Sequence, residues 1–588
     1  MKAQSAPQIT VLDAGGQYCH LIARKIRDLG VYAEVRASDT PASELRDRRG
    51  LIISGGPDSV YEQDSARIDP AILSTDCAVL GICYGQQLMA YNLGGHVRKG
   101  NKGEYGLAVL QRVKPHALFD GLNGDSQVWM NHRDQVESVP PGFETLAGTE
   151  TCAIAAMAHR ERPLLSVQFH PEVVHTTEGR RILSNFVFGI CGCKKDWNPK
   201  DRIGPLEEEI RAVAGDRNVF FFVSGGVDST VAYTLCLRAL GADRVYGIYV
   251  DTGLMRDGET PYVRRLFEQL GAKAFHAEEA EGEFLAALKG VCDPEKKRHI
   301  IGEQFVAVQE RVLSSGQFLD GRWILGQGTI YPDTIESGGT ARADVIKTHH
   351  NRVAGIQKLI ESGRIIEPLA SFYKDEVREI GAELGIPAEF LHRHPFPGPG
   401  LAIRCLCSES QAPVQPLDAG WLLPIRSVGV QGDSRSYRSV LALEKLPTDE
   451  LATTLVNQMW ESINRVVGVV RLRTGIISEM RSTRGTLTPE RLGRLRRADA
   501  IVRRLSDESG FERDVWQFPV VLIPLGVDSV PDSIVLRPIH SVDGMTAQVV
   551  RMPEDLLRKM ADELIKVEGI CGVFYDLTHK PPGTIEWE

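Results

Sequence analysis

A cysteine, a histidine and a glutamate in the first third of the sequence have the spacing of a nucleophilic catalytic site. Cys83 stands in GICYG (81–85), where an apolar run ends in a glycine turn and a helical pattern begins. This G-x-C-x-G form is typical of a nucleophile elbow, in which the helix N-terminus favours the thiolate. His170 and Glu172 follow a second apolar run in SVQFHPE (166–172). We expect His170 to accept the thiol proton and Glu172, on the same side of an extended strand, to orient the imidazole.

Each motif alone also has a structural explanation, because a cysteine after a buried strand is commonly a small core residue. The two motifs occur together, however, and in the order of the class I glutamine amidotransferase triad, which residues 8–190 therefore resemble. The resemblance implies hydrolysis of glutamine through a glutamyl thioester on the cysteine. It also implies that the backbone N–H groups of Gly56 and Tyr84 form the oxyanion hole. Gln87 and the stretch NHRD (131–134) are expected to line the glutamine site.

A glycine-rich loop, SGGVDS (224–229), lies between an apolar run of strand length and a helical pattern. Successive N–H groups of such a turn, with a helix N-terminus behind them, bind anionic oxygens. The lysine of the common nucleotide-binding loop is missing, and Asp228 beside an anion indicates a bridging Mg²⁺. A turn capped by Ser or Asp is the structural alternative. The loop resembles the pyrophosphate loop of the ATP pyrophosphatase family, which implies ATP binding by Ser224, Gly225, Gly226, Val227, Asp228 and Ser229.

Further stretches of the same region match that family. Val250, at the end of a strand pattern, is expected to pack the adenine, and Lys374, at a predicted helix start, is expected to reach a nucleotide phosphate. Asp333 is a second candidate Mg²⁺ ligand. IKTHHN (346–351) carries a lysine and two histidines in a segment expected to close over phosphates. Without the other motifs, this histidine pair would indicate only a polar loop.

With HPFPGPGLAIR (394–404) and KPPGTIEWE (580–588), the sequence resembles the GMP synthase family over nearly the whole chain. That resemblance implies amination of XMP to GMP by ammonia from glutamine, through an adenylated XMP, with ATP giving AMP and pyrophosphate. The implied partners are the small molecules XMP, ATP and glutamine, with Mg²⁺ accompanying ATP. For XMP binding the resemblance indicates Arg298, Asp433, Gln517, Lys580 and Glu586.

Two other functions stay open at this point. An RNA-thiolating enzyme would use the same pyrophosphate loop without ammonia, but the acidic charge balance and the fused glutaminase segment disfavour it. A non-catalytic regulator would keep the fold without the chemistry. The presence of Cys83, His170, Glu172 and Asp228 disfavours that interpretation.

The chain of 588 residues has 43% hydrophobic and 25% charged residues, the balance of an ordinary globular protein of several domains. A net charge of −9 disfavours nucleic-acid and membrane partners, and no run reaches the roughly 18 apolar residues of a membrane span. Eleven scattered cysteines and an N-terminus without a secretory pattern favour reduced thiols and a cytoplasmic location. Cys191 with Cys193, and Cys405 with Cys407, lack a second metal-binding pair, so we expect ordinary thiols.

The elements that must position these residues divide the sequence into three regions, two of them α/β and the last α+β. Residues 1–195 alternate short strands and helices, which predicts the open α/β sheet of a glutaminase domain. Residues 196–400 predict the doubly wound parallel sheet of an ATP pyrophosphatase domain, and the Pro- and Gly-rich stretch at 394–400 marks its end. Residues 401–588 predict an α+β region for XMP binding.

This last region has the pattern of a tandem duplicated module. Residues 449–474 and 554–580 each give an amphipathic helix, a polar turn and a strand, after a strand-rich segment. Chance similarity between two helix–strand pairs is the alternative. Short members of the GMP synthase family carry one such module and pair through it as homodimers. A second copy, with an insertion that includes 481–500, would supply that surface in cis, so we expect a monomer rather than a homodimer.

Overall fold

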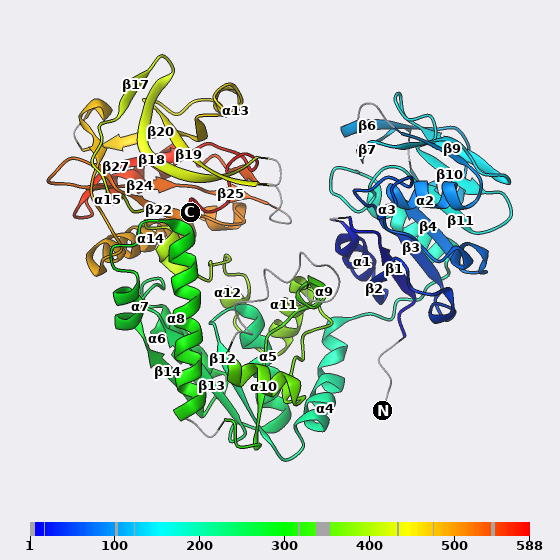
Figure 1. Ribbon diagram of the computed structural model, residues 1–588, viewed down its shortest axis with the longest axis horizontal. Coiled ribbons are helices and arrows are strands. Elements are labelled where there is room, and N and C mark those ends of the chain that lie inside the picture. Colours follow the sequence, from blue (N-terminus) through cyan, green and yellow to red (C-terminus); the bar gives the residue numbers. More distant parts are fainter. Residues whose placement is uncertain are drawn as a thin grey trace. The chain divides into compact units, whose positions relative to one another are not determined.

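The computed structural model divides the chain into two compact units, Met1–Pro205 with Tyr331–Ala341, and Leu206–Ile330 with Arg342–Glu588. Figure 1 shows their helices and strands. No helix in the described part of the chain is long and apolar enough to cross a membrane. The structure describes residues 6–16, 18–99, 104–122, 124–315, 318–336, 353–431, 434–473, 475–541 and 547–588.

The first unit is built on a nine-stranded sheet in the order β2-β1-β3-β4-β11-β10-β9-β6-β7 (Figure 1). The strands from β2 to β11 run parallel, and the strands beyond β11 continue the sheet in antiparallel pairs. Strands β3 and β4 are buried along their whole length, as short apolar runs between layers of helices are. The strand order turns back at β1, which has β2 on one side and β3 on the other. Open sheets bind ligands at such a point, beyond the carboxyl ends of the strands.

The elements of the first unit agree with the predicted open α/β sheet. Its strands are β1 (Ile9–Asp13), β2 (Ala33–Ala37), β3 (Gly50–Ile53), β4 (Ala78–Ile82), β5 (His96–Arg98), β6 (Glu104–Arg112), β7 (Ser126–His132), β8 (Gln135–Ser138), β9 (Phe143–Gly148), β10 (Ala156–His159) and β11 (Leu164–Val167). Its helices are α1 (Cys19–Arg27), α2 (Tyr84–Asn92), α3 (Gly179–Ser184) and α9 (Tyr331–Glu336).

The second unit begins with a five-stranded parallel sheet in the order β14-β13-β12-β15-β16. This confirms the predicted parallel sheet, and again the order turns at the first strand of the sheet, β12. The strands are β12 (Asn218–Val223), β13 (Val245–Asp251), β14 (Ala274–Glu279), β15 (Trp323–Gly326) and β16 (Ile365–Ile366). The helices around it are α4 (Ile203–Ala214), α5 (Val227–Leu240), α6 (Glu259–Gln269), α7 (Glu281–Ala287), α8 (Pro294–Ser315), α10 (Ala354–Glu361), α11 (Lys374–Glu383) and α12 (Ala388–Leu391).

The same unit carries a seven-stranded sheet in the order β17-β18-β19-β20-β27-β24-β22 (Figure 1). Its strands are β17 (Gln415–Leu417), β18 (Gly420–Gln431), β19 (Ser434–Leu443), β20 (Ile463–Leu472), β22 (Val520–Ile523), β24 (Asp532–Leu536) and β27 (Ile570–Asp576). Four two-residue strands flank it, namely β21 (Arg481–Ser482), β23 (Leu525–Gly526), β25 (Ile539–His540) and β26 (Gln548–Val549). Its helices are α13 (Asp449–Gln458), α14 (Pro489–Ser509) and α15 (Glu554–Leu564).

The two halves of this sheet have the same connectivity. In the first half β18 is antiparallel to β19, which runs parallel to β20 after helix α13. In the second half β22 is antiparallel to β24, which runs parallel to β27 after helix α15. Strands β20 and β27 join the halves as an antiparallel pair. Each half is thus a β-β-α-β module; that they arose by duplication stays a prediction.

The apolar stretch 518–527 contains two strands, β22 and β23, and Pro524 separates them because it has no N–H for the ladder. One detail differs from the sequence-based expectation. Strand β11 ends at Val167, so His170 and Glu172 lie in the loop beyond it. Strand alternation therefore does not place these two side chains together; the loop does.

Candidate active sites

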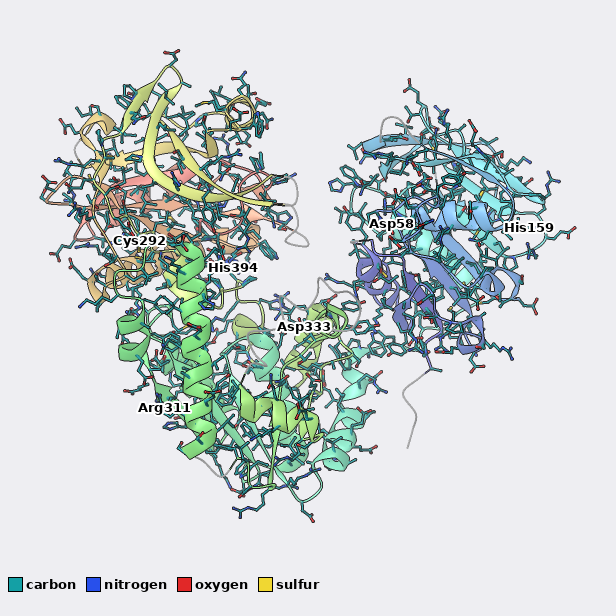
Figure 2. All side chains as sticks on the ribbon, viewed as in Figure 1. Asp58, His159, Cys292, Arg311, Asp333 and His394 are labelled. Carbon is teal, nitrogen blue, oxygen red and sulfur yellow. The ribbon has the colours of Figure 1, made fainter. Side chains whose placement is uncertain are left out.

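The first unit has a cavity of about 540 Å³ at the carboxyl edge of its parallel strands. The loop after β1 contributes Gly15 and Gly16, the loop after β3 contributes Gly55 and Gly56, and the turn after β4 contributes Cys83. The predicted NHRD stretch, residues 131–134, lines the same cavity, as does Asp58, which is labelled in Figure 2. The site therefore lies where the strand order of the sheet predicts a ligand.

Cys83 occupies a strained turn between β4 and α2. Its φ of 54° makes it the one non-glycine residue with a positive φ in the described part of the chain. The glycines on both sides are required, because a Cβ on Gly81 would lie 2.6 Å from the Gly85 carbonyl oxygen and one on Gly85 would lie 2.3 Å from that of Ile53. Backbone strain of this kind is maintained by the surrounding packing and is concentrated at functional residues. The geometry agrees with the predicted nucleophile elbow.

His170 and Glu172 form a buried hydrogen-bonded pair beside this cysteine. The Nδ1 atom of His170 lies 2.6 Å from Oε1 of Glu172, and both residues are almost inaccessible, at 3% and 1% exposure. Burial by itself would lower the pKa of His170, but the Glu172 carboxylate and the Cys83 sulfur together raise it well above its ordinary value. His170 also lines the Cys83 cavity, and its Nε2 atom has no hydrogen-bond partner among the described residues.

The predicted oxyanion residues lie at the same edge of the sheet. Tyr84 is the first residue of α2, and the first N–H groups of a helix have no acceptor within it. Gly56 comes so close to β1 that a Cβ there would lie 2.4 Å from the Ala14 carbonyl oxygen. Gln87 lines the cavity, but its amide nitrogen donates to the Asp134 carbonyl at 2.7 Å. The Gln87 side chain therefore stabilises the segment that forms this side of the cavity.

The SGGVDS loop links β12 to α5 in the second unit, as predicted. Gly225 has φ of 72°, a left-handed conformation that favours glycine, and Gly226 caps α5. The Ser224 and Ser229 hydroxyls lie 3.2 Å apart at the exposed mouth of the loop. The next hydroxyl, that of Thr230, is buried and donates to the Gly226 carbonyl, because it already lies in the first turn of the helix.

Asp228 and Lys374 form an ion pair at this loop. The Lys374 ammonium donates to both carboxylate oxygens, at 2.7 and 2.6 Å, from the first position of α11. Both side chains keep partial solvent access, at 41% for Lys374 and 27% for Asp228. An accessible carboxylate beside a phosphate loop fits Mg²⁺, which proteins usually bind through one or two carboxylates together with substrate phosphates and water.

Three further parts of the predicted ATP site differ in where they lie. Val250 lies near the carboxyl end of β13, the strand that pairs with β12. Asp333 (Figure 2) belongs to the first unit, and no group of three or more His, Cys, Asp or Glu in the described residues could hold a metal ion by itself. The IKTHHN segment, 346–351, lies outside the described residues.

Several predicted XMP residues surround the last residues of the sequence. Gln517 donates to a Glu586 carboxylate oxygen at 3.2 Å and to the Pro395 carbonyl at 3.0 Å. Arg298 donates to the backbone carbonyl of Glu588 at 2.5 Å. Lys580 is partly buried and pairs with Ala547 through its backbone, and Asp433 lies outside the described residues.

Two basic residues that were not predicted from the sequence complete this region. Arg404 binds both carboxylate oxygens of Glu586, at 2.9 and 2.7 Å, and is fully buried. Lys297 binds the Glu588 carboxylate at 2.5 Å, and burial raises the pKa of Glu588 to about 7 in spite of this partner. Arg404 ends the stretch 394–404 and Lys297 precedes Arg298, but only their burial against the last residues distinguishes them.

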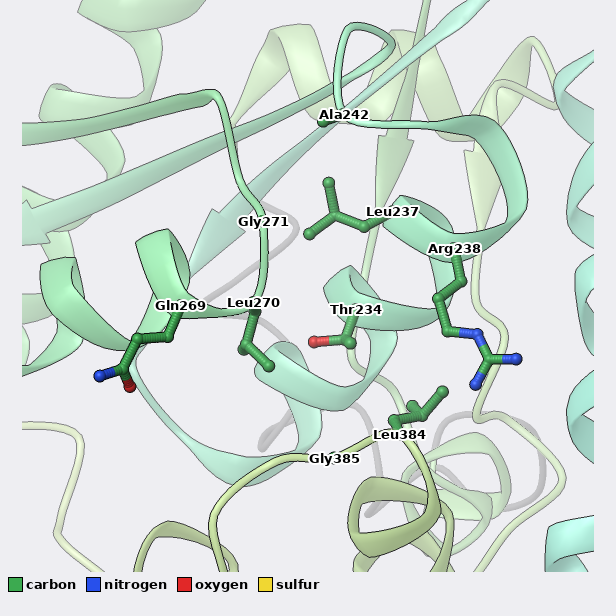
Figure 3. Close-up of a pocket in the computed structure, with 9 residues that line it drawn as sticks. All are labelled: Thr234, Leu237, Arg238, Ala242, Gln269, Leu270, Gly271, Leu384 and Gly385. Carbon is green, nitrogen blue, oxygen red and sulfur yellow. The ribbon is translucent and has the colours of Figure 1, made fainter.

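A smaller cavity of about 280 Å³ lies at the other end of α5 (Figure 3). Thr234, Leu237 and Arg238 line it from the later turns of that helix, with Gln269 and Leu384 from neighbouring elements. Since each helical residue adds about 1.5 Å, these turns lie on the order of 10 Å along the axis from the SGGVDS loop. None of the residues predicted for catalysis or binding lines it.

Comparison with known proteins finds family models that match the regions containing these sites. Three family models match: Glutamine amidotransferase class-I at residues 10–190, NAD synthase at 203–304, and GMP synthase C terminal domain at 505–587. The chain is 42% identical over 611 residues to a protein of Leptospira interrogans named "Probable GMP synthase", with 99% of each chain covered. It is 40% identical over 590 residues to the GMP synthase of Caldicellulosiruptor saccharolyticus, and 38% identical over 591 residues to that of Aquifex aeolicus, again with 99% of each chain covered.

Proposed function

The chain belongs to the family of glutamine-hydrolyzing GMP synthases, and from this premise we propose how its residues divide the synthesis of GMP. The single observation that carries the proposal is the Cys83 elbow with the His170–Glu172 pair, in the same chain as a domain that carries the pyrophosphate loop. The enzyme transfers a nitrogen from glutamine to a nucleotide at the expense of ATP.

The glutaminase half acts through the first unit. The Cys83 sulfur attacks the side-chain carboxamide of glutamine, and His170 carries the thiol proton to the departing ammonia. Glu172 holds the imidazole through Nδ1 and stabilises its protonated form. The N–H groups of Gly56 and Tyr84 stabilise the oxyanion of the tetrahedral intermediate. Water then hydrolyses the thioester to glutamate.

The synthetase half acts through the SGGVDS loop. Ser224, Gly225, Gly226, Val227, Asp228 and Ser229 hold the pyrophosphate of ATP while the O2 oxygen of XMP attacks the α-phosphorus. Lys374 leaves Asp228 for a phosphate oxygen, and Val250 packs against the adenine. Ammonia then displaces AMP from C2 of the adenylated XMP, which gives GMP. Asp228, with Asp333 as a second candidate, would hold the Mg²⁺ ion that accompanies ATP, and the ion would offset phosphate charge.

XMP binds against the segment at the end of the sequence. We assign Arg298 and Lys580 to its 5′-phosphate, and Gln517 and Glu586 to the rest of the nucleotide, with Asp433 as a further contact. Support comes from the direct contact between Gln517 and Glu586, and from Arg298 lying against Glu588.

The proposed function also indicates the domain boundaries, the oligomeric state and the cellular location. We propose a glutaminase domain at 1–195, an ATP pyrophosphatase domain at 196–400 and a duplicated XMP-binding region at 401–588. A monomeric state is proposed because one chain supplies both β-β-α-β halves. A cytoplasmic location is proposed because all eleven cysteines are unpaired.

The test separates the two reactions with two nitrogen sources. GMP formation is followed by the loss of XMP absorbance with ATP and either glutamine or ammonium. Cys83→Ala should abolish the glutamine-driven reaction and keep the ammonium-driven one, whereas the control Cys77→Ala should keep both. Loss of both reactions in Cys83→Ala would contradict this division. For XMP, Glu586→Gln should raise the KM for XMP; an unchanged KM would remove Glu586 from the site.

A further inference from the structure

Three charged side chains form a buried network inside the seven-stranded sheet. Arg465 lies on β20, Asp576 is the last residue of β27, and Arg537 follows β24 directly. Each of them has 0% exposure. Completely buried charges destabilise a fold unless they are paired and hydrogen-bonded. The partners of these three side chains therefore indicate what the network does.

The carboxylate of this network is fully engaged. One Asp576 oxygen accepts hydrogen bonds from Arg465 and from the Trp587 indole N–H, both at 2.8 Å, and forms an ion pair with Arg537 at 2.8 Å. The other accepts from the Thr578 backbone N–H at 2.9 Å. Two guanidinium groups on one carboxylate leave one excess positive charge inside the protein. Burial and the Arg537 charge lower the pKa of Arg465 to about 9, although Asp576 and Glu586 raise it.

Both guanidinium groups also donate hydrogen bonds to backbone carbonyls in the last residues of the sequence. Arg465 donates to the carbonyls of Thr584 and Glu586 at 3.0 and 2.7 Å. Arg537 donates to those of Thr584 and Ile585 at 2.8 and 3.1 Å. Three successive carbonyls are thus bound by the same two guanidinium groups. Charge-assisted hydrogen bonds of this kind are about twice as strong as neutral ones.

The bound segment carries Glu586 on its other side. With its carbonyl held by Arg465, the Glu586 carboxylate reaches Arg404 and Gln517. The next residue, Trp587, is fully buried with its ring 5.1 Å from the Arg465 guanidinium carbon, and its carbonyl accepts from the Val428 N–H at 2.9 Å. The hydrogen bonds of the Glu586 and Trp587 carbonyls, with the burial of the Trp587 ring, therefore fix the direction of the Glu586 side chain.

We propose that Arg465, Arg537 and Asp576 are positioning residues for XMP: they fix the segment 584–587 so that Glu586 faces the nucleotide. The inference rests on the proposed function, in which Glu586 contacts XMP. It also assigns a role to the first β-β-α-β half, since Arg465 on β20 and Val428 on β18 both hold a segment that follows the second half. None of the three is expected to touch XMP.

Two mild variants test the proposal in the full-length enzyme. Trp587→Phe removes the indole donor to Asp576 and keeps a ring in the core. Arg537→Lys keeps the positive charge but loses the planar guanidinium that presents separate N–H groups to Thr584 and Ile585. Loss of one or two such bonds should raise the KM for XMP about threefold for Trp587→Phe and about tenfold for Arg537→Lys. The KM values for ATP and glutamine should stay unchanged, and kcat should fall less than the KM for XMP rises.

The chain offers a matched control. Arg491 and Arg494 bind the buried Asp532 at 3.0 and 2.7 Å, which is a second Arg–Asp–Arg network in the same sheet. Among the described residues, the two arginines also donate to the carbonyls of Thr486, Leu406 and Glu568 and to the Glu490 carboxylate, none of which lies in 584–588. Asp532→Asn should destabilise the fold without changing the KM for XMP.

The outcomes separate this inference from the function on which it rests. If Asp532→Asn raises the KM for XMP as much as Arg537→Lys does, the effect is a general loss of packing and the proposal is wrong. If Glu586→Gln raises that KM and both folded test variants leave it unchanged, Glu586 binds XMP but the network does not position it. If Glu586→Gln leaves it unchanged, the XMP contact and the positioning role both fail.

Discussion

The Nδ1 atom of His170 lies 2.6 Å from Oε1 of Glu172, with both side chains almost completely buried. This contact fixes the imidazole so that its Nε2 atom is left for the cavity that Cys83 lines. The same contact keeps a positive charge on the ring favourable at a depth where burial alone would oppose it. The pair therefore sets both the orientation and the charge of the catalytic base.

Replacing Glu172 by Gln should lower the pKa of His170. In the native protein the pKa of His170 is raised well above 6.5, so its ring stays protonated above that pH. Protonation of His170 therefore stabilises the fold fully below pH 6.5, and this stabilisation is lost as the pH rises through the raised pKa. Without the carboxylate, burial dominates and the pKa should fall. NMR titration of the His170 ring in both proteins measures the shift. An unchanged or higher pKa in Glu172→Gln would contradict the role given to the pair.

The same variant should lose glutaminase activity by about 10²- to 10⁴-fold, because the imidazole is no longer held in the reactive tautomer. Ammonium-driven GMP synthesis should be unchanged, since that reaction does not use the first unit's cavity. Equal losses with both nitrogen sources would show that the substitution damages the whole enzyme.

Gly56→Ala should remove the oxyanion donor without touching the nucleophile. The new Cβ would lie 2.4 Å from the Ala14 carbonyl oxygen, so the loop after β3 must move and carry its N–H away. Loss of one such donor costs about 10²- to 10³-fold in kcat. Gly189→Ala is the control, because nothing lies within 4 Å of a Cβ at that position. If alkylation of Cys83 by iodoacetamide also slows as much as turnover, the loss comes from the elbow and the assignment of Gly56 is wrong.

Asp228→Asn should abolish GMP formation from glutamine and from ammonium alike. It removes the carboxylate that holds Lys374 and that we assign to Mg²⁺, so ATP loses both a pre-positioned cation and a metal ligand. A fall of at least about a hundredfold is expected in XMP-dependent exchange of labelled pyrophosphate into ATP. Asp243→Asn breaks an exposed pair with Lys273 in the same unit and should have no effect. Normal exchange in Asp228→Asn would exclude Asp228 from the ATP site.

Much of this organisation could be predicted from the sequence, because local patterns determine it. The strands before Cys83 and before Ser224 are short apolar runs, and the glycines that follow them require tight turns. The His170–Glu172 pair was predicted for the wrong reason, since it forms in a loop and not along a strand. The Asp228–Lys374 pair joins residues 146 positions apart, a distance over which no local pattern acts.

The network around Arg465 could not be predicted from the sequence. Arg465 stands in an apolar strand, where a charged residue normally marks the exposed face, yet it is completely buried. Its partners, Asp576 and the carbonyl of Glu586, lie more than a hundred residues away. Burial of such a charge depends on which strands meet in the sheet, and the pairing of β20 with β27 is a property of the fold.

The pairing of β20 with β27 also predicts the oligomeric state. These strands join the two β-β-α-β halves within one chain, so the edge that a single module would offer to a second molecule is already occupied. The enzyme should therefore be a monomer of 64.9 kDa over a wide range of concentration. Size-exclusion chromatography with light scattering, with and without XMP and ATP, measures this directly. A dimer that persists on dilution would show that another surface of the chain mediates assembly, and the two halves would then not replace a partner.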